Sequence, residues 1–195
     1  MCSWCYAFGP VLERLLTSLP QQIAVKRLLG GLATDSDEPM PQQMQSYLQL
    51  TWRRIETRVP GIQFNFDFWH QCQPRRSTWR ACRAVIAARQ QNAVFDETMT
   101  RAIQQAYYQQ ARNPSDRETL IALAAEIGAD SDRFAQQLDA DITQSLLIEE
   151  MEVNRGLGVD SFPSLVLLTD DNRQKLIEVD YWDAAQMRER IESLL

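Results

Sequence analysis

The sequence predicts an α/β fold in which strands near the two ends of the chain flank an all-α insertion. Residues 23–29 and 164–168 have the short, unbroken apolar pattern of buried strands. Between them, apolar residues recur at helical spacing from about residue 42 to 153, and Gly and Pro residues interrupt this pattern between successive helices. Two cysteines, Cys2 and Cys5, stand directly before a further apolar helix pattern.

The first part of the chain predicts a helix, a strand and a second helix. Apolar residues at positions 11, 12, 15, 16 and 19 form one face of a helix that starts at the cysteine pair. Residues 23–29 predict a strand that ends at Gly30-Gly31. After a loop with two prolines, residues 42–59 predict a helix that ends at Pro60-Gly61.

The rest of the chain predicts four more helices and then a return to strands. The helices are expected at residues 77–91, 95–111, 115–127 and 131–153. They are followed by a strand at 164–168, a turn at 170–172, a strand at 175–179 and a final helix with Asp183 as its N-cap.

Composition excludes several classes of partner. The chain has 195 residues, of which 45% are hydrophobic, enough to bury a sizeable core without disulfide staples. A net charge of −6 and the lack of any basic run argue against nucleic acid and anionic membranes as partners. No apolar run approaches the roughly 20 residues that a membrane helix needs.

Cys2 and Cys5 point to redox chemistry. Residues three apart on a helix are surface neighbours, with Cβ atoms roughly 5–6 Å apart, so a small rotamer change joins or separates the sulfurs. The unpaired N–H groups and the dipole at a helix N-terminus favour the thiolate, which is the nucleophile. Cys2 is therefore predicted to attack and Cys5 to resolve. Half of a zinc site and a pair of buried structural thiols are the alternatives.

A second motif is Phe162-Pro163, which leads the apolar run of residues 164–168. With the CxxC before a helix and the long helical middle, it resembles the DsbA-like thiol:disulfide oxidoreductases of the thioredoxin superfamily, in particular the FrnE-like group with a helical insertion. The likeness spans nearly the whole chain. It implies a thioredoxin-like fold formed by residues 1–40 and 129–195, with the helical insertion at residues 41–128.

The resemblance also implies roles for individual residues. Cys2 and Cys5 are the implied catalytic residues. Pro163 is the implied cis-proline that lies against the active-site sulfurs, and the backbone of Phe162 is expected to pair with a substrate peptide. Trp4, between the cysteines, is a further candidate for substrate binding. No metal and no cofactor are implied.

The family places a β-strand before the CxxC helix, in the interior of the sheet, whereas only Met1 precedes the motif here. The N-terminal strand is therefore expected to be missing from this chain, which leaves a gap between residues 23–29 and 164–168. One alternative is that Met1 is an internal residue of a longer polypeptide, which would supply the strand. The other is that the chain begins here, in which case the gap has to close or be filled by another chain. A cytoplasmic location is favoured because no signal peptide opens the sequence. A periplasmic location is the alternative if the sequence lacks its original N-terminal residues.

The aromatic segment 62–76 and the other two cysteines carry weaker signals. Phe68 and Trp69 are candidates for the apolar surface that receives a substrate, with core or hinge packing as the alternative. His70 with the CxxC and Cys72 or Cys82 would make up a set of zinc ligands, although no pattern brings these residues together. Cys82 lies on the apolar side of its helix, as buried structural thiols do. A Cys72–Cys82 disulfide is a further possibility.

The predicted function is that of a thiol–disulfide oxidoreductase acting on protein or peptide dithiols and disulfides, with glutathione as a further candidate partner. One alternative is a glutathione-dependent transferase or isomerase of the kappa-like branch, which has no need of Cys5. The other is a non-catalytic thioredoxin-like module.

Overall fold

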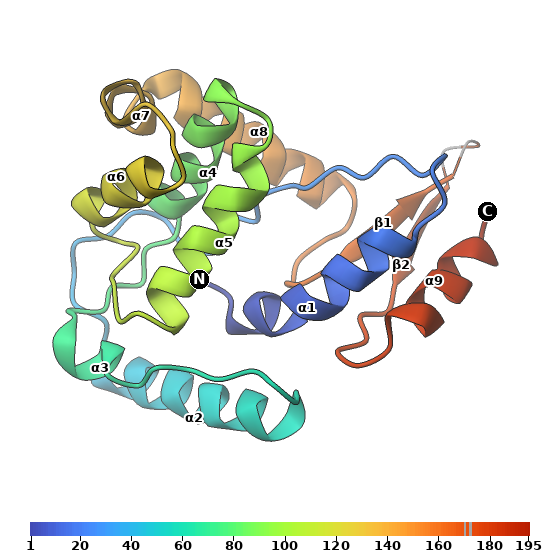
Figure 1. Cartoon of the computed structure of the whole chain (residues 1–195), viewed down its shortest axis with the longest axis horizontal. Coiled ribbons are helices and arrows are strands. Elements are labelled where there is room, and N and C mark those ends of the chain that lie inside the picture. Colours follow the sequence, from blue (N-terminus) through green and yellow to red (C-terminus); the bar gives the residue numbers. More distant parts are fainter. Residues whose placement is uncertain (170, 172) are drawn as a thin grey trace.

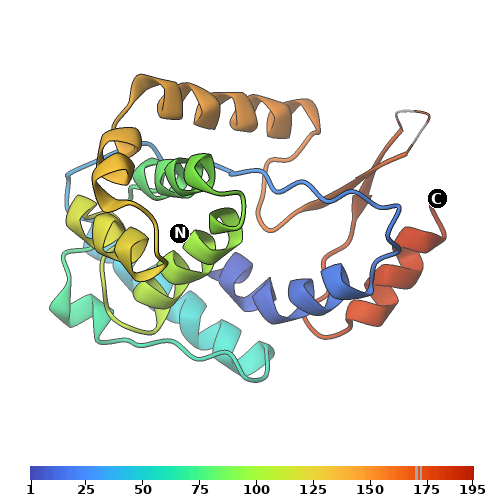
Figure 2. The same cartoon turned by 45° about the horizontal axis from the view of Figure 1, so that its top comes forward.

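The computed structural model describes residues 1–169, 171 and 173–195, and helices dominate it (Figure 1). In chain order the elements are α1 (Ser3–Ser18), α2 (Gln42–Arg58), α3 (Phe68–Gln71), α4 (Trp79–Gln91), α5 (Phe95–Tyr108), α6 (Arg117–Glu126), α7 (Ser131–Leu138), α8 (Asp141–Gly156), β1 (Leu165–Leu168), β2 (Gln174–Ile177) and α9 (Ala184–Glu192). In both views α1 runs between the helical segment and the pair of strands (Figure 1 and Figure 2). The helix that carries the cysteines is thus central to the molecule.

The strands β1 and β2 form an antiparallel hairpin in which Leu165 lies opposite Ile177. Both strands lie close to their predicted positions. The predicted turn between them falls partly outside the described residues, because Asp170 and Asn172 are not among them. In the described part of the chain, these two strands are the whole sheet.

One face of the hairpin is covered by α1 and α9. Their inward side chains form a buried cluster, and each large apolar side chain in it stabilises the fold by about 1.5–3 kcal/mol. The members are Phe8, Val11, Leu15, Leu167, Ile177, Met187 and Ile191. The apolar face predicted for the first helix is confirmed, and it fixes α1 against the strand that follows Pro163.

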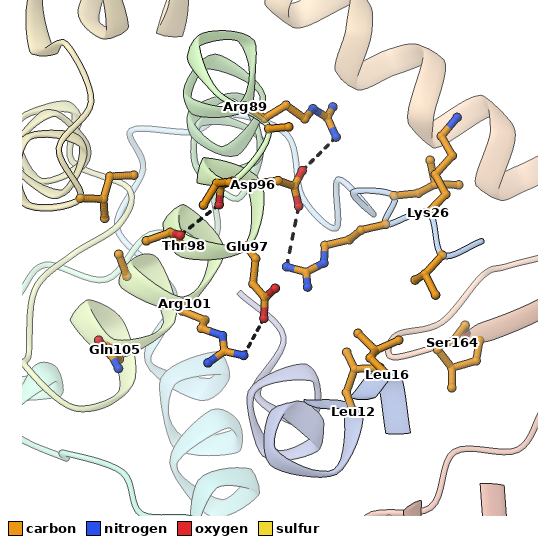
Figure 3. Close-up of a pocket in the computed structure, with 18 residues that line it drawn as sticks. Leu12, Leu16, Lys26, Arg89, Asp96, Glu97, Thr98, Arg101, Gln105 and Ser164 are labelled. Atoms are coloured by element: carbon orange, nitrogen blue, oxygen red, sulfur yellow. Dashed lines mark hydrogen bonds and ion pairs between the residues drawn. The ribbon is translucent and has the colours of Figure 1, made fainter. Parts of the chain in front are cut away.

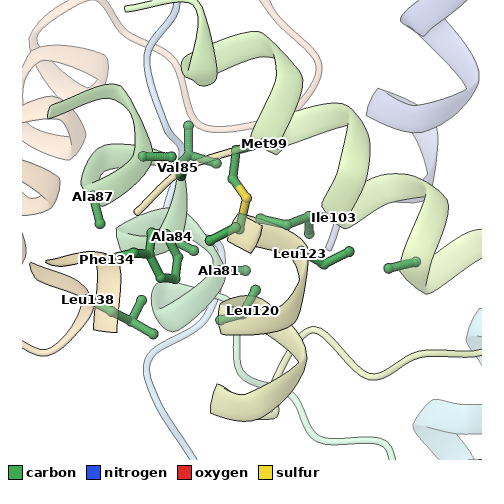
Figure 4. Packing of buried hydrophobic residues seen from close by; sticks show 14 residues of the cluster. Ala81, Ala84, Val85, Ala87, Met99, Ile103, Leu120, Leu123, Phe134 and Leu138 are labelled. Carbon is green, nitrogen blue, oxygen red and sulfur yellow. The ribbon is translucent and has the colours of Figure 1, made fainter. Parts of the chain in front are cut away.

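The helical segment is built around α4, which packs against α5, α6, α7 and α8. Its small residues Ala84 and Ala87 are fully buried (Figure 4), as is Ala88, so the neighbouring helices can approach closely. A second cluster surrounds Trp52 of α2, where six aromatic rings lie within 6.3 Å of the indole, centroid to centroid. Two cores therefore support the part of the chain between residues 42 and 156.

The single helix predicted over residues 131–153 is wrong, because the chain forms two helices there, α7 and α8. Between them, Ala140 has an extended backbone with φ −74° and ψ 140°. The carbonyl of Leu138 accepts a hydrogen bond of 3.2 Å from Nε of Arg83 instead of continuing the helical ladder. A partner on another helix thus ends α7, and the apolar spacing along the chain gives no sign of it.

The strand predicted at residues 23–29 is also wrong, because this segment has no strand partner. The N–H of Leu29 donates to the Glu150 carboxylate at 2.7 Å, and the Leu29 carbonyl accepts from the Asn154 side chain at 3.0 Å. Within the described part of the chain, the N–H groups of residues 24–28 have no hydrogen-bond partner. A strand needs a paired neighbour, and here side chains of α8 hold only one end of the segment.

A cavity of about 1180 Å³ lies beside this segment (Figure 3). Leu12 and Leu16 of α1 and Ser164 line one side of it, and Asp96 and Arg101 of α5 line the other. Residues 25–28 and the start of β1 both line this cavity, and the two apolar segments do not pair.

The predicted division at residues 40/41 and 128/129 stays a prediction. Helices continue past residue 128 through α7 and α8 to Gly156. Of the described helices, none combines the length and the apolar character that crossing a bilayer requires.

Candidate active site

Cys2 is the N-cap of α1 and Cys5 lies in its first turn. The backbone of Cys2 is extended, with φ −89° and ψ 116°, and its carbonyl accepts the first helical hydrogen bond, from Tyr6 N–H at 3.3 Å. Both cysteines are free thiols and partly exposed. The predicted helical spacing of the pair is therefore present at the start of the helix.

The two thiols differ strongly in acidity. A hydrogen bond from the Cys5 thiol is the largest of the effects that together lower the pKa of Cys2 to about 6. Burial opposes this effect, while the backbone N–H groups of Cys5 and Trp4, which are free at the helix start, add to it. For Cys5 the direction is reversed, because the same hydrogen bond and burial raise its pKa above the ordinary value. Cys2 is thus the thiolate of the pair and Cys5 the thiol.

The second half of the site is the loop before β1. The Phe162–Pro163 peptide bond is cis, the isomer that the resemblance predicts. The Cys2 thiol donates to the Phe162 carbonyl over 3.3 Å. This contact is available only to the thiol form, so it opposes ionisation, and the donors from α1 outweigh it. Residues 160 positions apart in the sequence meet at the reactive sulfur.

The Phe162 ring packs on Gly30. A Cβ atom at Gly30 would lie 2.3 Å from Cζ of Phe162, so only glycine leaves room for the ring. Phe162 thus contacts Cys2 through its backbone carbonyl, while its ring packs on Gly30.

Trp4 lies against residues that the sequence analysis did not single out. Its ring meets that of Tyr181 edge-on, with centroids 5.1 Å apart, and Tyr181 also contacts Phe8. Burial and the nearby charges of Cys2 and Cys5 raise the pKa of Tyr181 to about 12. Nothing in the sequence marks Tyr181, which precedes the final helix and reaches the site only through the fold.

The structure corrects the role suggested for Phe68 and Trp69. Their side chains are only 1% and 8% exposed and belong to the cluster around Trp52. Such burial leaves almost no surface for a substrate. The alternative of core packing applies.

The remaining cysteines are separate thiols. Cys72 donates to the Ala111 carbonyl over 3.0 Å, and burial raises its pKa. Burial likewise raises the pKa of Cys82 to about 11. Both are free, so the suggested Cys72–Cys82 disulfide is not present. The described residues contain no cluster of three or more His, Cys, Asp or Glu side chains arranged for a metal ion.

Comparison with known proteins decides the family. The family model described as thioredoxin matches residues 1–189. This chain belongs to the thioredoxin family. The resemblance seen in the CxxC and Phe162-Pro163 motifs is thereby confirmed.

Solved structures confirm the fold of this thioredoxin-family chain. A crystal structure of a candidate protein disulfide isomerase from Nitrosomonas europaea has a TM-score of 0.82 at 22% identity, covering 99% of this chain and 92% of that one. The cytosolic disulfide reductase DsbM from Pseudomonas aeruginosa has a TM-score of 0.79, also at 22% identity, covering 100% and 94%. Its structure with GSH has a TM-score of 0.76 at the same identity and coverage. The predicted fold class, thioredoxin-like α/β with a helical insertion, is confirmed.

The curated relatives are named as adapter proteins and not as disulfide oxidoreductases. The chain is 24% identical over 183 residues to the ClpXP adapter protein SpxH of Halalkalibacterium halodurans and 20% identical over 180 residues to that of Bacillus subtilis. Each match covers 92% of this chain but only 59% of the relative.

Proposed function

We propose that this thioredoxin-family chain is a thiol–disulfide oxidoreductase that uses Cys2 and Cys5 as its redox pair. The observation that carries the proposal is the position of Cys2, which caps α1 with Cys5 one turn behind it and the Phe162 carbonyl 3.3 Å from its sulfur. The structural neighbours described as a disulfide reductase and a candidate disulfide isomerase support the same reaction class.

In the first step, the Cys2 thiolate attacks one sulfur of a substrate disulfide. A bond forms between Sγ of Cys2 and that sulfur, the substrate S–S bond breaks, and the other sulfur leaves as a thiolate that takes up a proton. With a pKa of about 6, Cys2 is mostly in the reactive thiolate form at neutral pH. The Phe162 carbonyl loses its donor when Cys2 ionises, so it is free to accept a hydrogen bond from the substrate backbone.

In the second step, Cys5 loses its proton and attacks Sγ of Cys2. The Cys2–Cys5 disulfide forms as the mixed disulfide breaks, and the substrate leaves with two electrons gained. Once Cys2 is in the mixed disulfide, Cys5 no longer faces its negative charge, so one of the effects that raise the Cys5 pKa is lost. Two molecules of an external thiol such as glutathione then reduce the pair and leave as their own disulfide, and oxidation of a dithiol runs through the same steps in reverse.

Cysteine variants test the proposal. Cys2→Ser is expected to abolish insulin reduction with a thiol reductant, whereas Cys5→Ser is expected to accumulate a mixed disulfide with the substrate that mass spectrometry detects. Cys72→Ser is the control and should keep full turnover. Full multi-turnover activity of Cys5→Ser would contradict the resolving role.

A glutathione-dependent transferase or isomerase is the second candidate, and the DsbM structure with GSH gives it some support. Such an enzyme needs one thiolate-stabilising position and does not need a thiol at Cys5. Retained transferase activity in Cys5→Ser, without a trapped mixed disulfide, would favour it over disulfide exchange.

A non-catalytic role is the third candidate, because the curated relatives are named as ClpXP adapters. Thiols that fail to cycle between oxidised and reduced states in a defined redox buffer would favour it. The proposal includes a cytoplasmic location, where reducing thiols are present. This location matches the description of DsbM as cytosolic.

A further inference from the structure

A second, smaller cavity of about 420 Å³ adjoins the proposed redox site. Four parts of the chain form it: the CxxC helix, the end of α2, the loop before β1 and the segment after β2. Its lining residues are Trp4, Arg58, Phe162, Pro163, Val179, Tyr181 and Trp182. Two of them, Phe162 and Pro163, belong to the loop that contacts Cys2, so any group in this cavity lies next to a substrate bound at the dithiol.

The walls are held in place by contacts between these parts. Nε1 of Trp182 donates to the Arg58 carbonyl over 3.0 Å and so joins the last turn of α2 to the segment before α9. Tyr181 contacts Trp4 on one side and Trp182 on the other, with centroids 5.1 and 6.2 Å apart. Trp182 nevertheless remains 59% exposed, which leaves its ring available to a ligand.

Arg58 sets the charge of this cavity. Among the described residues that line it, Arg58 is the one side chain that carries a formal charge. Its guanidinium forms no ion pair or hydrogen bond with the described part of the chain, whereas Arg27, Arg75, Arg83 and Arg89 all pair with carboxylates. An exposed, unpaired cation beside aromatic rings fits a ligand that has both a carboxylate and apolar surface.

We propose that this Arg58 cavity binds the part of the substrate next to its reacting cysteine and selects peptides with a carboxylate there. The substrates it favours are peptide thiols and disulfides with an acidic group one or two residues from the cysteine. The aromatic walls contact the apolar part of the peptide, and Arg58 pairs with the carboxylate. The inference rests on the proposed function, because it concerns specificity at the same site.

Because the protein has a net charge of −6, long-range electrostatics disfavour acidic peptides in general. A preference for them therefore needs a local cation, and a variant at Arg58 should reveal it.

The test compares two disulfide-linked peptides that differ only in the group beside cysteine, Glu in one and Gln in the other. The wild-type protein is expected to favour the Glu peptide by about 2- to 5-fold in kcat/KM, mostly through KM, as for a partly exposed ion pair. Arg58→Gln should bring this ratio to about 1 and Arg58→Glu should reverse it. Added salt should weaken the wild-type preference.

Arg54→Gln is the matched control. Arg54 lies one turn earlier on α2, is exposed, and does not line the cavity. This variant should keep the wild-type ratio. Equal use of the two peptides by the wild-type protein, or an unchanged ratio in Arg58→Gln, would overturn the specificity inference while leaving disulfide exchange intact. Failure of the wild-type protein to turn over either peptide would instead overturn the proposed function.

Discussion

The acidity of Cys2 makes a quantitative prediction about the rate of attack on a disulfide. With a pKa of about 6, about half of Cys2 is thiolate at pH 6, against about 0.3% for an ordinary cysteine with a pKa of about 8.5. Nucleophilicity falls with pKa, at a Brønsted slope of about 0.4–0.5, which makes the Cys2 thiolate about 13-fold less reactive once formed. The net advantage is about tenfold at pH 6, and it becomes a disadvantage above about pH 7.4, where the gain in thiolate fraction no longer exceeds the roughly 13-fold loss of nucleophilicity.

Cys5→Ala removes the hydrogen bond that contributes most to this low pKa. The rate at pH 6 should fall by up to about tenfold, while the plateau at high pH should rise, so the two pH profiles cross. Cys5→Ser keeps a donor and should lie between wild type and Cys5→Ala. The rise at high pH distinguishes a changed pKa from a damaged site.

Initial release of the chromophore from a neutral pyridyl disulfide measures this rate by stopped flow. All three proteins should have Cys72→Ser in addition, so that the half-buried thiol of Cys72 does not contribute. Profiles that coincide, or that fall in parallel at every pH, would refute the assignment of Cys5 as the main stabiliser of the Cys2 thiolate.

Three further predictions concern stability. Gly30→Ala should displace the Phe162 ring, destabilise the fold by about 1–3 kcal/mol and lower turnover. Gly9→Ala is the control and should be neutral or stabilising, because a Cβ at Gly9 meets no atom within 4 Å. Thermal unfolding measures the effect on stability, and kcat/KM measures the effect on turnover. The pKa of Cys2 is lower in the folded than in the unfolded chain, so the reduced protein should gain stability as the pH rises from about 6 to about 8.5, and Cys2→Ser should remove this part of the pH dependence of the melting temperature. A short β-branched segment fused before Met1 should raise the melting temperature by several degrees if it enters the 1180 Å³ cavity, and a Gly/Ser segment of equal length should not.

Local patterns in the sequence were enough to predict α1 and the position of two cysteines at its start. The apolar face of the helix, and the two cysteines at its start, depend only on residues within about five turns of one another. The ends of the helices were harder to predict. For example, α7 ends where Arg83 of another helix donates a hydrogen bond to the Leu138 carbonyl. Residues 23–29 have a strand pattern but no neighbour to pair with, which no local pattern reveals.

The residues that lie beside Cys2 and Trp4 in the fold could be predicted only in part. Phe162 and Pro163 were found through a motif, whereas Tyr181, Trp182 and Arg58 belong to no motif and meet Trp4 only through the fold. Phe68 and Trp69 show the converse error, since exposure cannot be judged from residue type alone and both rings are buried.

The origin of each contact suggests which property of the reaction it controls. The acidity of Cys2 comes mainly from groups within three residues of it, on the first turn of α1, so changes there should alter the pH profile for every substrate alike. Apart from Trp4, the residues that line the Arg58 cavity come from the end of α2 and from the loops beside the hairpin, more than 50 residues away from the cysteines in sequence. Changes in those loops should alter KM and the choice of peptide while the thiolate stays the same. Two results would show that the two sets of contacts are coupled. One is an Arg58 variant that shifts the pH profile of Cys2, and the other is a Cys5 variant that changes the preference between acidic and neutral peptides. Tyr181 and Trp4 would then be the physical link between the two sets.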